Sequence, residues 1–199
     1  SVDAAIGRKR LSQSAVFPPV TRYLLDTCVI YPTVMRELLL GVAKAGAFEP
    51  LWSARILEEW ARAARKIGPT GETQARGEAA VMRANWPKAE VIWKPSLEDR
   101  LYLPDAADEH VLAAAISGSA DAIVTLNAKD FPRGLLAEEG LKRIDPDGLL
   151  RTFWETDPTL VETVAEAVRR EAERLSGEDW EMRRLLKKAR LPRLAKALG

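Results

Sequence analysis

Short apolar segments alternate along this chain with longer segments of helical periodicity, and this alternation restricts the possible folds more than any other feature. The first apolar segment, Tyr23–Ile30, is rich in Leu, Val and Ile on both faces, which is typical of a parallel strand covered by helices. Further strands are predicted at residues 48–53, 89–95, 121–127 and 141–145. Because helical patterns separate these strands, we expect an α/β protein whose parallel sheet has helices on both sides.

The two ends of the chain lack a strand pattern. Residues 1–20 show no clear period and are predicted to form an N-terminal arm, whereas residues 156–199 carry only helical patterns separated by proline and glycine. The predicted organisation is therefore an α/β domain at residues 21–155 followed by a C-terminal helical extension. Within the domain, Thr33 and Ser53 are predicted helix N-caps because each stands at the start of a run of helical period.

Composition excludes several classes of function. The chain of 199 residues has a formal net charge of +1, so its bulk charge does not indicate a nucleic-acid-binding protein. One cysteine, Cys28, excludes an internal disulfide and fits a reducing compartment, so we expect a cytoplasmic protein. One cysteine and one histidine, His110, are too few ligands for a structural zinc site, and carboxylates become the better candidates for chemistry. No apolar run approaches the roughly 18 residues needed to cross a bilayer.

Acidic residues recur where predicted strands pass into helices or loops. Asp26 lies inside the first apolar segment, although an unpaired buried carboxylate costs several kcal/mol or loses its charge. Asp105 and Asp108 lie in the first turn of a predicted helix, three residues apart and so on one helical face. Asp130 follows the predicted strand at residues 121–127. The remaining candidates, in the helix after the second strand, are Glu58 and Glu59.

These acidic residues predict a divalent cation site. Ligands of open parallel sheets bind at the carboxyl ends of the strands, where the acidic residues are expected to meet. Like carboxylates repel one another, and a hard divalent cation removes that conflict. Mg²⁺ and Mn²⁺ prefer oxygen ligands, and either ion can activate water and stabilise charge on a phosphate under attack. Carboxylates without histidine or cysteine ligands therefore indicate Mg²⁺ or Mn²⁺ and phosphodiester hydrolysis.

Three stretches resemble the successive motifs of PIN-domain proteins, including VapC-type toxin ribonucleases: LLDTCVIYP, WSARILEEW and LPDAADEHVLAAAISGSADAIVTLNAKDFP. The resemblance spans about residues 22–150, and its most specific part runs from Asp108 through Phe131. It implies a three-layer α/β/α sandwich and a ribonuclease that cleaves single-stranded RNA with Mg²⁺ or Mn²⁺. For a toxin it further implies a small antitoxin partner, and family members often form homodimers.

The resemblance also implies the site residues. Asp26 matches the first acidic residue of the family, and Asp108 matches the third. The second is Glu59 in preference to Glu58, because it lies six residues after Ser53. The fourth falls in the stretch TLNAKDF, where Asp130 is the best candidate. The expected supporting residues are Thr27, Asp105, Thr125 and Asn127.

Several alternatives stay open. Some members of the family carry aspartate where this chain has Asn127, which favours a non-catalytic RNA-binding or protein-interaction module. A third alternative is the hydrolysis of a small phosphate compound. Asp105 can serve equally as a helix N-cap, Cys28 is expected to be a small core residue, and His110 is expected to be structural or exposed rather than a catalytic base.

The end of the chain is strongly basic. Residues 181–199 contain one acidic residue, Glu181, against many lysines and arginines. This segment can serve as an electrostatic track for phosphates, or as an amphipathic helix with a solvated basic face. The two interpretations are compatible. The basic residues are Arg183, Arg184, Lys187, Lys188, Arg190, Arg193 and Lys196.

Overall fold

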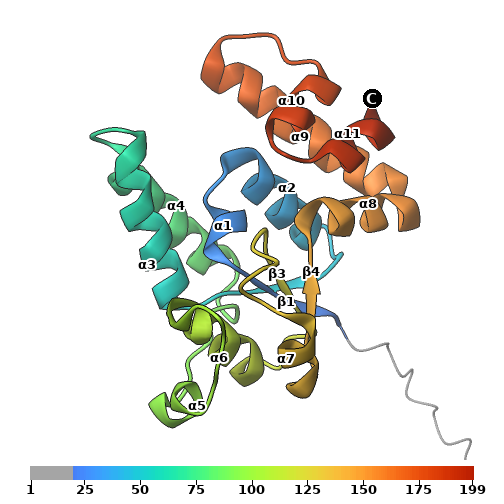
Figure 1. Ribbon diagram of the computed structural model, residues 1–199. Helices are drawn as coiled ribbons and strands as arrows, with labels where there is room; N and C mark the ends of the chain where they lie inside the picture. The colour runs from blue at the N-terminus through green and yellow to red at the C-terminus, as the bar shows by residue number, and fades with distance from the viewer. Residues whose placement is uncertain (1–19) are drawn as a thin grey trace, which may run out of the picture.

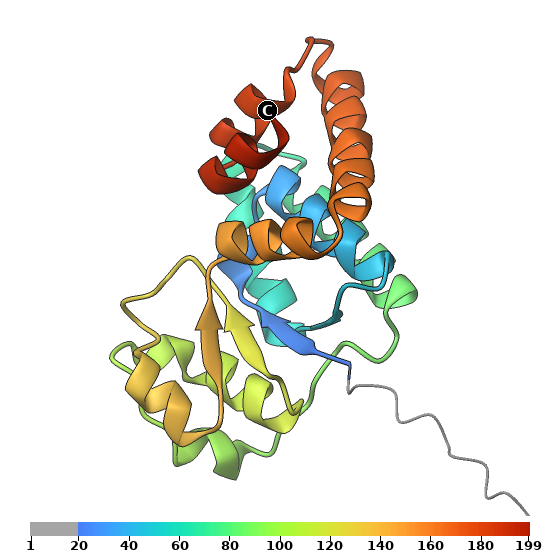
Figure 2. The ribbon, with the colours of Figure 1, turned by 90° about the vertical axis from the view of Figure 1, so that its right-hand side faces the viewer.

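A computed structural model describes residues 20–199, so nearly all of the predicted N-terminal arm lies outside the described residues. Its centre is a parallel four-stranded sheet with the strand order β2-β1-β3-β4 (Figures 1 and 2). In the register of the sheet, Leu24 of β1 pairs with Leu51 of β2 and with Ile123 of β3. The strands are β1 Arg22–Leu25, β2 Glu49–Leu51, β3 Ala122–Val124 and β4 Lys142–Ile144.

Helices flank this sheet and confirm the predicted α/β/α class. Helix α6 packs against β1 and β3, whereas α2 packs against β2. The buried side chains form one hydrophobic core that extends from the sheet into the C-terminal helices. The helices of the body are α1 Thr27–Ile30, α2 Thr33–Lys44, α3 Ala54–Ala63, α4 Gly71–Asn85, α5 Pro95–Asp99, α6 Glu109–Ser117 and α7 Arg133–Glu138, with short 3-10 turns η1 Ala64–Ile67 and η2 Ala106–Asp108.

The first predicted strand is shorter than its apolar pattern suggests. It was expected to continue to Ile30, but β1 ends at Leu25 and residues 27–30 form the helical turn α1. Asp26 is the N-cap of this turn, and its carboxylate accepts a hydrogen bond from the Thr27 backbone N–H. Val29 and Ile30 are buried as core residues of the helical turn. An apolar run that remains buried across a strand-to-helix junction gives no sign of the change in backbone conformation.

The predicted strand at residues 89–95 was also wrong. Glu90 makes only an isolated parallel bridge to Trp52, and the Val91 N–H donates to the Trp52 carbonyl at 2.8 Å. Pro95 then lies in the first turn of α5. The segment therefore touches the sheet edge next to β2 without continuing along it. The two short helices α5 and α7 had not been predicted.

One of the two predicted helix caps is confirmed. The Ser53 hydroxyl accepts a hydrogen bond from the Ile56 N–H at 3.1 Å and caps α3. The prediction for Thr33 was wrong, since Pro32 occupies the N-cap position of α2 without a side-chain hydrogen bond. The ring of Pro32 fixes the φ angle of the residue that precedes the helix, so the Thr33 hydroxyl is not needed as a cap.

Four helices form the C-terminal part of the chain. The buried side chain of Asp147, in α8, accepts hydrogen bonds from the N–H groups of Arg193 and Leu194 at 2.9 and 3.0 Å. This remote cap attaches the N-terminus of α11 to α8. No helix in residues 20–199 is long and apolar enough to cross a membrane. The helices are α8 Pro146–Thr156, α9 Pro158–Ser176, α10 Met182–Lys188 and α11 Pro192–Leu198.

Candidate metal centre

Asp26 lies at the carboxyl end of the central strand β1, and its side chain is only 7% exposed. Both carboxylate oxygens have donors. Oδ1 accepts from the Thr27 N–H at 2.8 Å, and Oδ2 accepts from the Thr125 hydroxyl at 2.8 Å. The Cys28 thiol donates a longer hydrogen bond to Oδ2 at 3.4 Å. One backbone donor and two side-chain donors therefore hold this buried carboxylate in one orientation.

The hydrogen bonds do not fully offset the burial of Asp26. Burial raises the pKa of this carboxyl above its usual value, and the negative charge of Glu59 raises it further. The hydrogen bonds from Thr125, Cys28 and Thr27 act in the opposite direction. Since the ionised form is disfavoured in the absence of a cation, a positive charge nearby would be strongly favourable.

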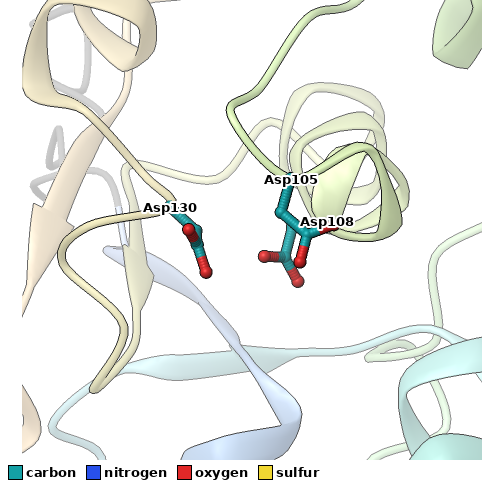
Figure 3. A group of neighbouring side chains, drawn as sticks. All are labelled: Asp105, Asp108 and Asp130. Atoms are coloured by element: carbon teal, nitrogen blue, oxygen red, sulfur yellow. The ribbon is translucent and has the colours of Figure 1, made fainter.

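Three other aspartates approach one another beside this position. Asp105, Asp108 and Asp130 each place a carboxylate oxygen within 4.8 Å of the others. Asp105 and Asp108 come from the 3-10 turn that precedes α6, and Asp130 comes from the loop after β3. Figure 3 shows that the carboxylates point from these two segments toward a common space. Residues far apart in the sequence thus form one acidic group.

Electrostatics connect Asp26 to this group. Partial burial raises the pKa of Asp108 to about 6, and the negative charges of Asp26, Asp105 and Asp130 contribute to the rise. Asp26 and Asp108 therefore lie at the same edge of the sheet, close enough to repel each other. This is the arrangement that the spacing of acidic residues predicted.

Glu59 lies between two polar partners. The Thr27 hydroxyl donates to Oε2 of Glu59 at 3.1 Å, and Nε2 of His110 lies 2.8 Å from Oε1. Partial burial alone would raise the pKa of Glu59, but the contacts with His110, Thr27 and Arg55 lower it overall. Glu59 does not belong to the group of three aspartates whose carboxylate oxygens lie within 4.8 Å of one another. It is connected to the site because its negative charge raises the pKa of Asp26.

The neighbouring Glu58 has a different environment. Its carboxylate forms ion pairs with Arg62 and Arg76 at 3.0 and 2.6 Å on the surface. The hydrogen bonds from Arg76 and Arg62 lower the pKa of Glu58 to about 2. Of the two glutamates, only Glu59 therefore faces the acidic site, as the sequence register favoured.

The loop after β3 holds Asp130 through Asn127. The side-chain amide of Asn127 donates a short hydrogen bond to Oδ2 of Asp130. The Asn127 backbone N–H in turn donates to the Thr125 hydroxyl at 3.0 Å, and this hydroxyl donates to Asp26. A continuous hydrogen-bonded chain thus joins Asp130 to Asp26. Asn127 is therefore placed to orient the carboxylate of Asp130.

Two residues near the site have roles that the sequence did not indicate. Cys28 was expected to be a core residue, yet its sulfur contacts Asp26 and Thr125. Burial and the Asp26 charge raise the pKa of the Cys28 thiol to about 11, so it acts as a neutral donor. His110 was expected to be structural or exposed, and it is buried, with 1% exposure, beside Glu59. The signal for His110 is a lone polar side chain within an apolar helical stretch, because such a group needs a partner.

Asp105 caps a helical turn and also lies in the acidic group. Its carboxylate accepts a hydrogen bond from the Ala107 N–H at 2.9 Å as the N-cap of η2, and it also belongs to the group of three aspartates. A carboxylate can cap a helix with one oxygen and keep the other free. The capping role and the site role are therefore compatible.

The residues fit a hard divalent cation. The three aspartates offer oxygen donors that lie within 4.8 Å of one another, and oxygen ligands are those that Mg²⁺ binds, at about 2.1 Å. Their mutual repulsion, visible in the raised pKa of Asp108, is what a cation would relieve. Soft ligands do not contribute, since Cys28 is protonated and His110 faces Glu59.

The chain is an α/β protein with a parallel sheet between helices and a group of aspartates beside the carboxyl ends of the strands. A family profile described as PIN domain matches residues 22–129, which is more than half of the chain. The chain belongs to the PIN-domain family. Proteins of this family are generally metal-dependent nucleases. Asp130 lies one residue beyond the matched segment. No curated protein and no solved structure matches the chain.

Proposed function

We propose that this protein is an endoribonuclease that hydrolyses phosphodiester bonds of single-stranded RNA with Mg²⁺ or Mn²⁺, and that residues 21–155 form its nuclease domain. The observation that carries the proposal is the convergence of Asp26 and the group Asp105, Asp108 and Asp130 on one edge of the sheet. Membership of the PIN-domain family supports nuclease chemistry at this edge.

The chain's own residues have distinct tasks in this proposal. Asp108 and Asp130 would hold the cation with Asp26 and Glu59 around it, and Asp105 would support Asp108. A divalent ion bound there would activate water and neutralise charge on the phosphate. Thr125 and Thr27 keep the carboxylates of Asp26 and Glu59 oriented, since each hydroxyl donates to one of them.

The same geometry limits what else can act as a nucleophile. The Cys28 thiol has a pKa raised to about 11 and donates to Asp26, so it is not a reactive thiolate. The Thr125 hydroxyl is 3% exposed and donates to Asp26, so it is not free to attack. Water remains as the nucleophile, and no covalent enzyme intermediate is expected.

A direct test is cleavage of a fluorescent single-stranded RNA by purified protein in Mg²⁺, in Mn²⁺ and in EDTA. We expect cleavage with either metal and none in EDTA. Asp108→Asn should reduce the rate by at least about 100-fold, because loss of a charge at a metal site removes several kcal/mol of stabilisation. Glu58→Gln is the matched control: it removes a carboxylate from the same protein surface outside the site and should cleave normally.

A second candidate is a non-catalytic RNA-binding or protein-interaction module. It is favoured by Asn127, which stands where some family members carry an acidic residue. RNA binding in a gel-shift assay without cleavage in Mg²⁺ or Mn²⁺ would select this function. The contact from Asn127 to Asp130 favours catalysis instead, because it orients an acidic residue next to the site.

The resemblance to VapC-type proteins supports a toxin role, in which a small antitoxin partner covers the acidic edge. It also supports a homodimer. Expression of the chain in a bacterial host tests the toxin role: we expect growth arrest with the unaltered chain and normal growth with Asp108→Asn. Growth arrest by both proteins would contradict a toxicity that depends on RNA cleavage.

A further inference from the structure

The C-terminal helices carry a surface of positive charge that the nuclease site does not use. Seven basic side chains of residues 183–196 are exposed, and the buried side chains of α10 and α11 face the other way. We call this set the C-terminal basic surface. It consists of Arg183, Arg184, Lys187, Lys188, Arg190, Arg193 and Lys196.

The arginines of the C-terminal basic surface differ from most arginines of the preceding chain in having no carboxylate partner. Between residues 20 and 174, every arginine except Arg133 and Arg143 forms an ion pair. Arg143 instead donates to two backbone carbonyls. Within the described part of the chain, no member of the C-terminal basic surface forms an ion pair. Its charge is therefore available to an external anion.

Like charges are placed next to each other on α10. Arg184 and Lys188 lie one helical turn apart, and both cations lie over the Trp180 ring, at 4.7 and 4.9 Å from its centre. Arg183 and Lys187 form a second pair with the same spacing. Like charges at this spacing destabilise a helix. A bound polyanion would convert this repulsion into attraction.

Arg190 occupies a backbone position that favours glycine. Its φ is +64°, in the left-handed region, at the turn between α10 and α11. Leu191 N–H donates to the Leu186 carbonyl at 2.9 Å, as in the usual C-terminal cap of a helix, where glycine is the common residue. The Arg190 side chain is therefore present against a local conformational preference.

The fold places this surface at the same end of the sheet as the aspartates. Asp147 attaches α11 to α8, and α8 begins at Pro146, two residues after β4 ends. The carboxyl ends of all four parallel strands lie on one side, where Asp26 and Asp130 are found. Figures 1 and 2 show α10 and α11 beyond α8 on that side.

We infer that the C-terminal basic surface binds the phosphate backbone of the RNA substrate at nucleotides outside the cleavage site. This inference rests on the proposed function, because it assigns the substrate class of that site to a second surface. Phosphate contacts of this kind are independent of sequence and sensitive to salt. The surface would increase the affinity for long strands and would not act on the reacting phosphate.

Binding in EDTA tests this inference separately from catalysis. Fluorescence anisotropy with a 20-nucleotide poly(U) strand should give an affinity that falls with salt. The triple variant Arg184→Gln, Lys187→Gln, Lys188→Gln should lower the slope of log K against log salt by about 2, since each contact with a single strand contributes about 0.7. This corresponds to weaker binding by about 10- to 100-fold near 0.1 M salt.

Two controls separate a local surface from net charge and from stability. A control triple variant removes the same charge from three exposed lysines elsewhere: Lys44→Gln, Lys66→Gln, Lys88→Gln. It should leave the slope of log K against log salt nearly unchanged. Arg190→Gly should keep or raise the Tm by relieving the positive φ, while lowering the slope by about 0.7. If Arg190 had only a structural role, its replacement would not lower the affinity for poly(U) while the Tm is retained or raised.

The outcomes are distinguishable from those of the nuclease proposal. Equal affinity and equal slope for the unaltered chain and the triple variant would overturn this inference, whether or not the protein cleaves RNA. A surface that serves an acidic protein partner would make the triple variant lose binding to poly-glutamate and retain poly(U), which would also overturn it. Salt-sensitive RNA binding that is lost in the triple variant supports the inference even if no cleavage is detected.

Discussion

The hydroxyl of Thr125 donates a hydrogen bond of 2.8 Å to Oδ2 of Asp26, joining the carboxyl ends of the neighbouring strands β1 and β3. Thr125 is 3% exposed, so water cannot replace this donor easily. The bond explains how the fold keeps a nearly buried carboxylate beside the other acidic residues.

Removal of this hydroxyl should affect both stability and activity. We expect Thr125→Val to lower the free energy of unfolding by about 1–3 kcal/mol, because it leaves a buried acceptor with one donor fewer. RNA cleavage should fall by roughly 10-fold, since the pKa of Asp26 would rise further and its orientation would loosen. Urea unfolding and a cleavage assay measure the two effects. Thr125→Ser, which keeps the hydroxyl, should retain most of the activity, and equal losses in both variants would contradict this role.

Asp26 itself should be dispensable for folding in the absence of metal. Asp26→Asn removes a carboxyl group whose pKa is raised by burial and by the charge of Glu59. The amide oxygen of the new side chain can still accept a hydrogen bond from the Thr27 N–H. We therefore expect an unchanged or higher Tm in EDTA, together with loss of metal-dependent RNA cleavage. Thermal unfolding in EDTA and a cleavage assay check both parts. A folded, clean variant that cleaves at the normal rate would count decisively against the proposed site.

His110 should act through Glu59. We expect His110→Leu to reduce RNA cleavage by roughly 10-fold, because Glu59 would lose a partner 2.8 Å away and would no longer be held in place. The double variant His110→Leu, Glu59→Gln should be no worse than Glu59→Gln alone, since residues that contact each other do not have additive effects. Cleavage rates of the unaltered protein, the two single variants and the double variant form a double-mutant cycle. Additive losses would show that His110 acts independently of Glu59.

The response to metal should depend on pH through Asp108. The pKa of this carboxyl is raised to about 6, so the folded, metal-free protein takes up a proton as the pH falls through about 6, before the unfolded chain does at its lower pKa. Between these two pKa values, lowering the pH stabilises the metal-free fold, whereas the proton competes with a cation. We expect the Mn²⁺-induced rise in Tm to be clearly larger at pH 7.5 than at pH 5. An equal rise at both values would argue against Asp108 as a ligand.

Asp147 should control the attachment of α11. Asp147→Ala leaves the N–H groups of Arg193 and Leu194 without their acceptor, so we expect a loss of about 1–3 kcal/mol in the free energy of unfolding. Hydrogen exchange should become faster in residues 192–198. Asp179→Ala, at an exposed position outside this contact, is the control and should change neither measurement. Slow exchange retained in the Asp147 variant would show that side-chain packing alone holds α11.

The sequence predicted the class of fold because strand and helix periods differ clearly over most of the chain. It failed where the apolar pattern continues across a change of backbone. The segment Tyr23–Ile30 has buried residues on both sides of Asp26, yet a strand ends and a helical turn begins there. The segment at residues 89–95 looked like a strand but lies at the sheet edge, where only Glu90 makes a bridge. The short helices α5 and α7 have too few turns to show a period.

The candidate acidic residues could be selected from the sequence because carboxylates stand out at strand–helix junctions. Their supporting contacts were not, since they depend on side-chain directions across distant segments. Nothing in the sequence joins Asn127 to Asp130 or His110 to Glu59. The sequence also left both interpretations of the basic C-terminus open, and the fold adds that its cations have no carboxylate partners within the described residues.

Crystals soaked in MnCl₂ and measured at the manganese absorption edge would locate a cation bound by the aspartates. We expect an anomalous peak within ligand distance of Asp108 and Asp130, and loss of that peak in Asp108→Asn crystals. A peak bound by other residues, or none at millimolar Mn²⁺ and neutral pH, would contradict this expectation.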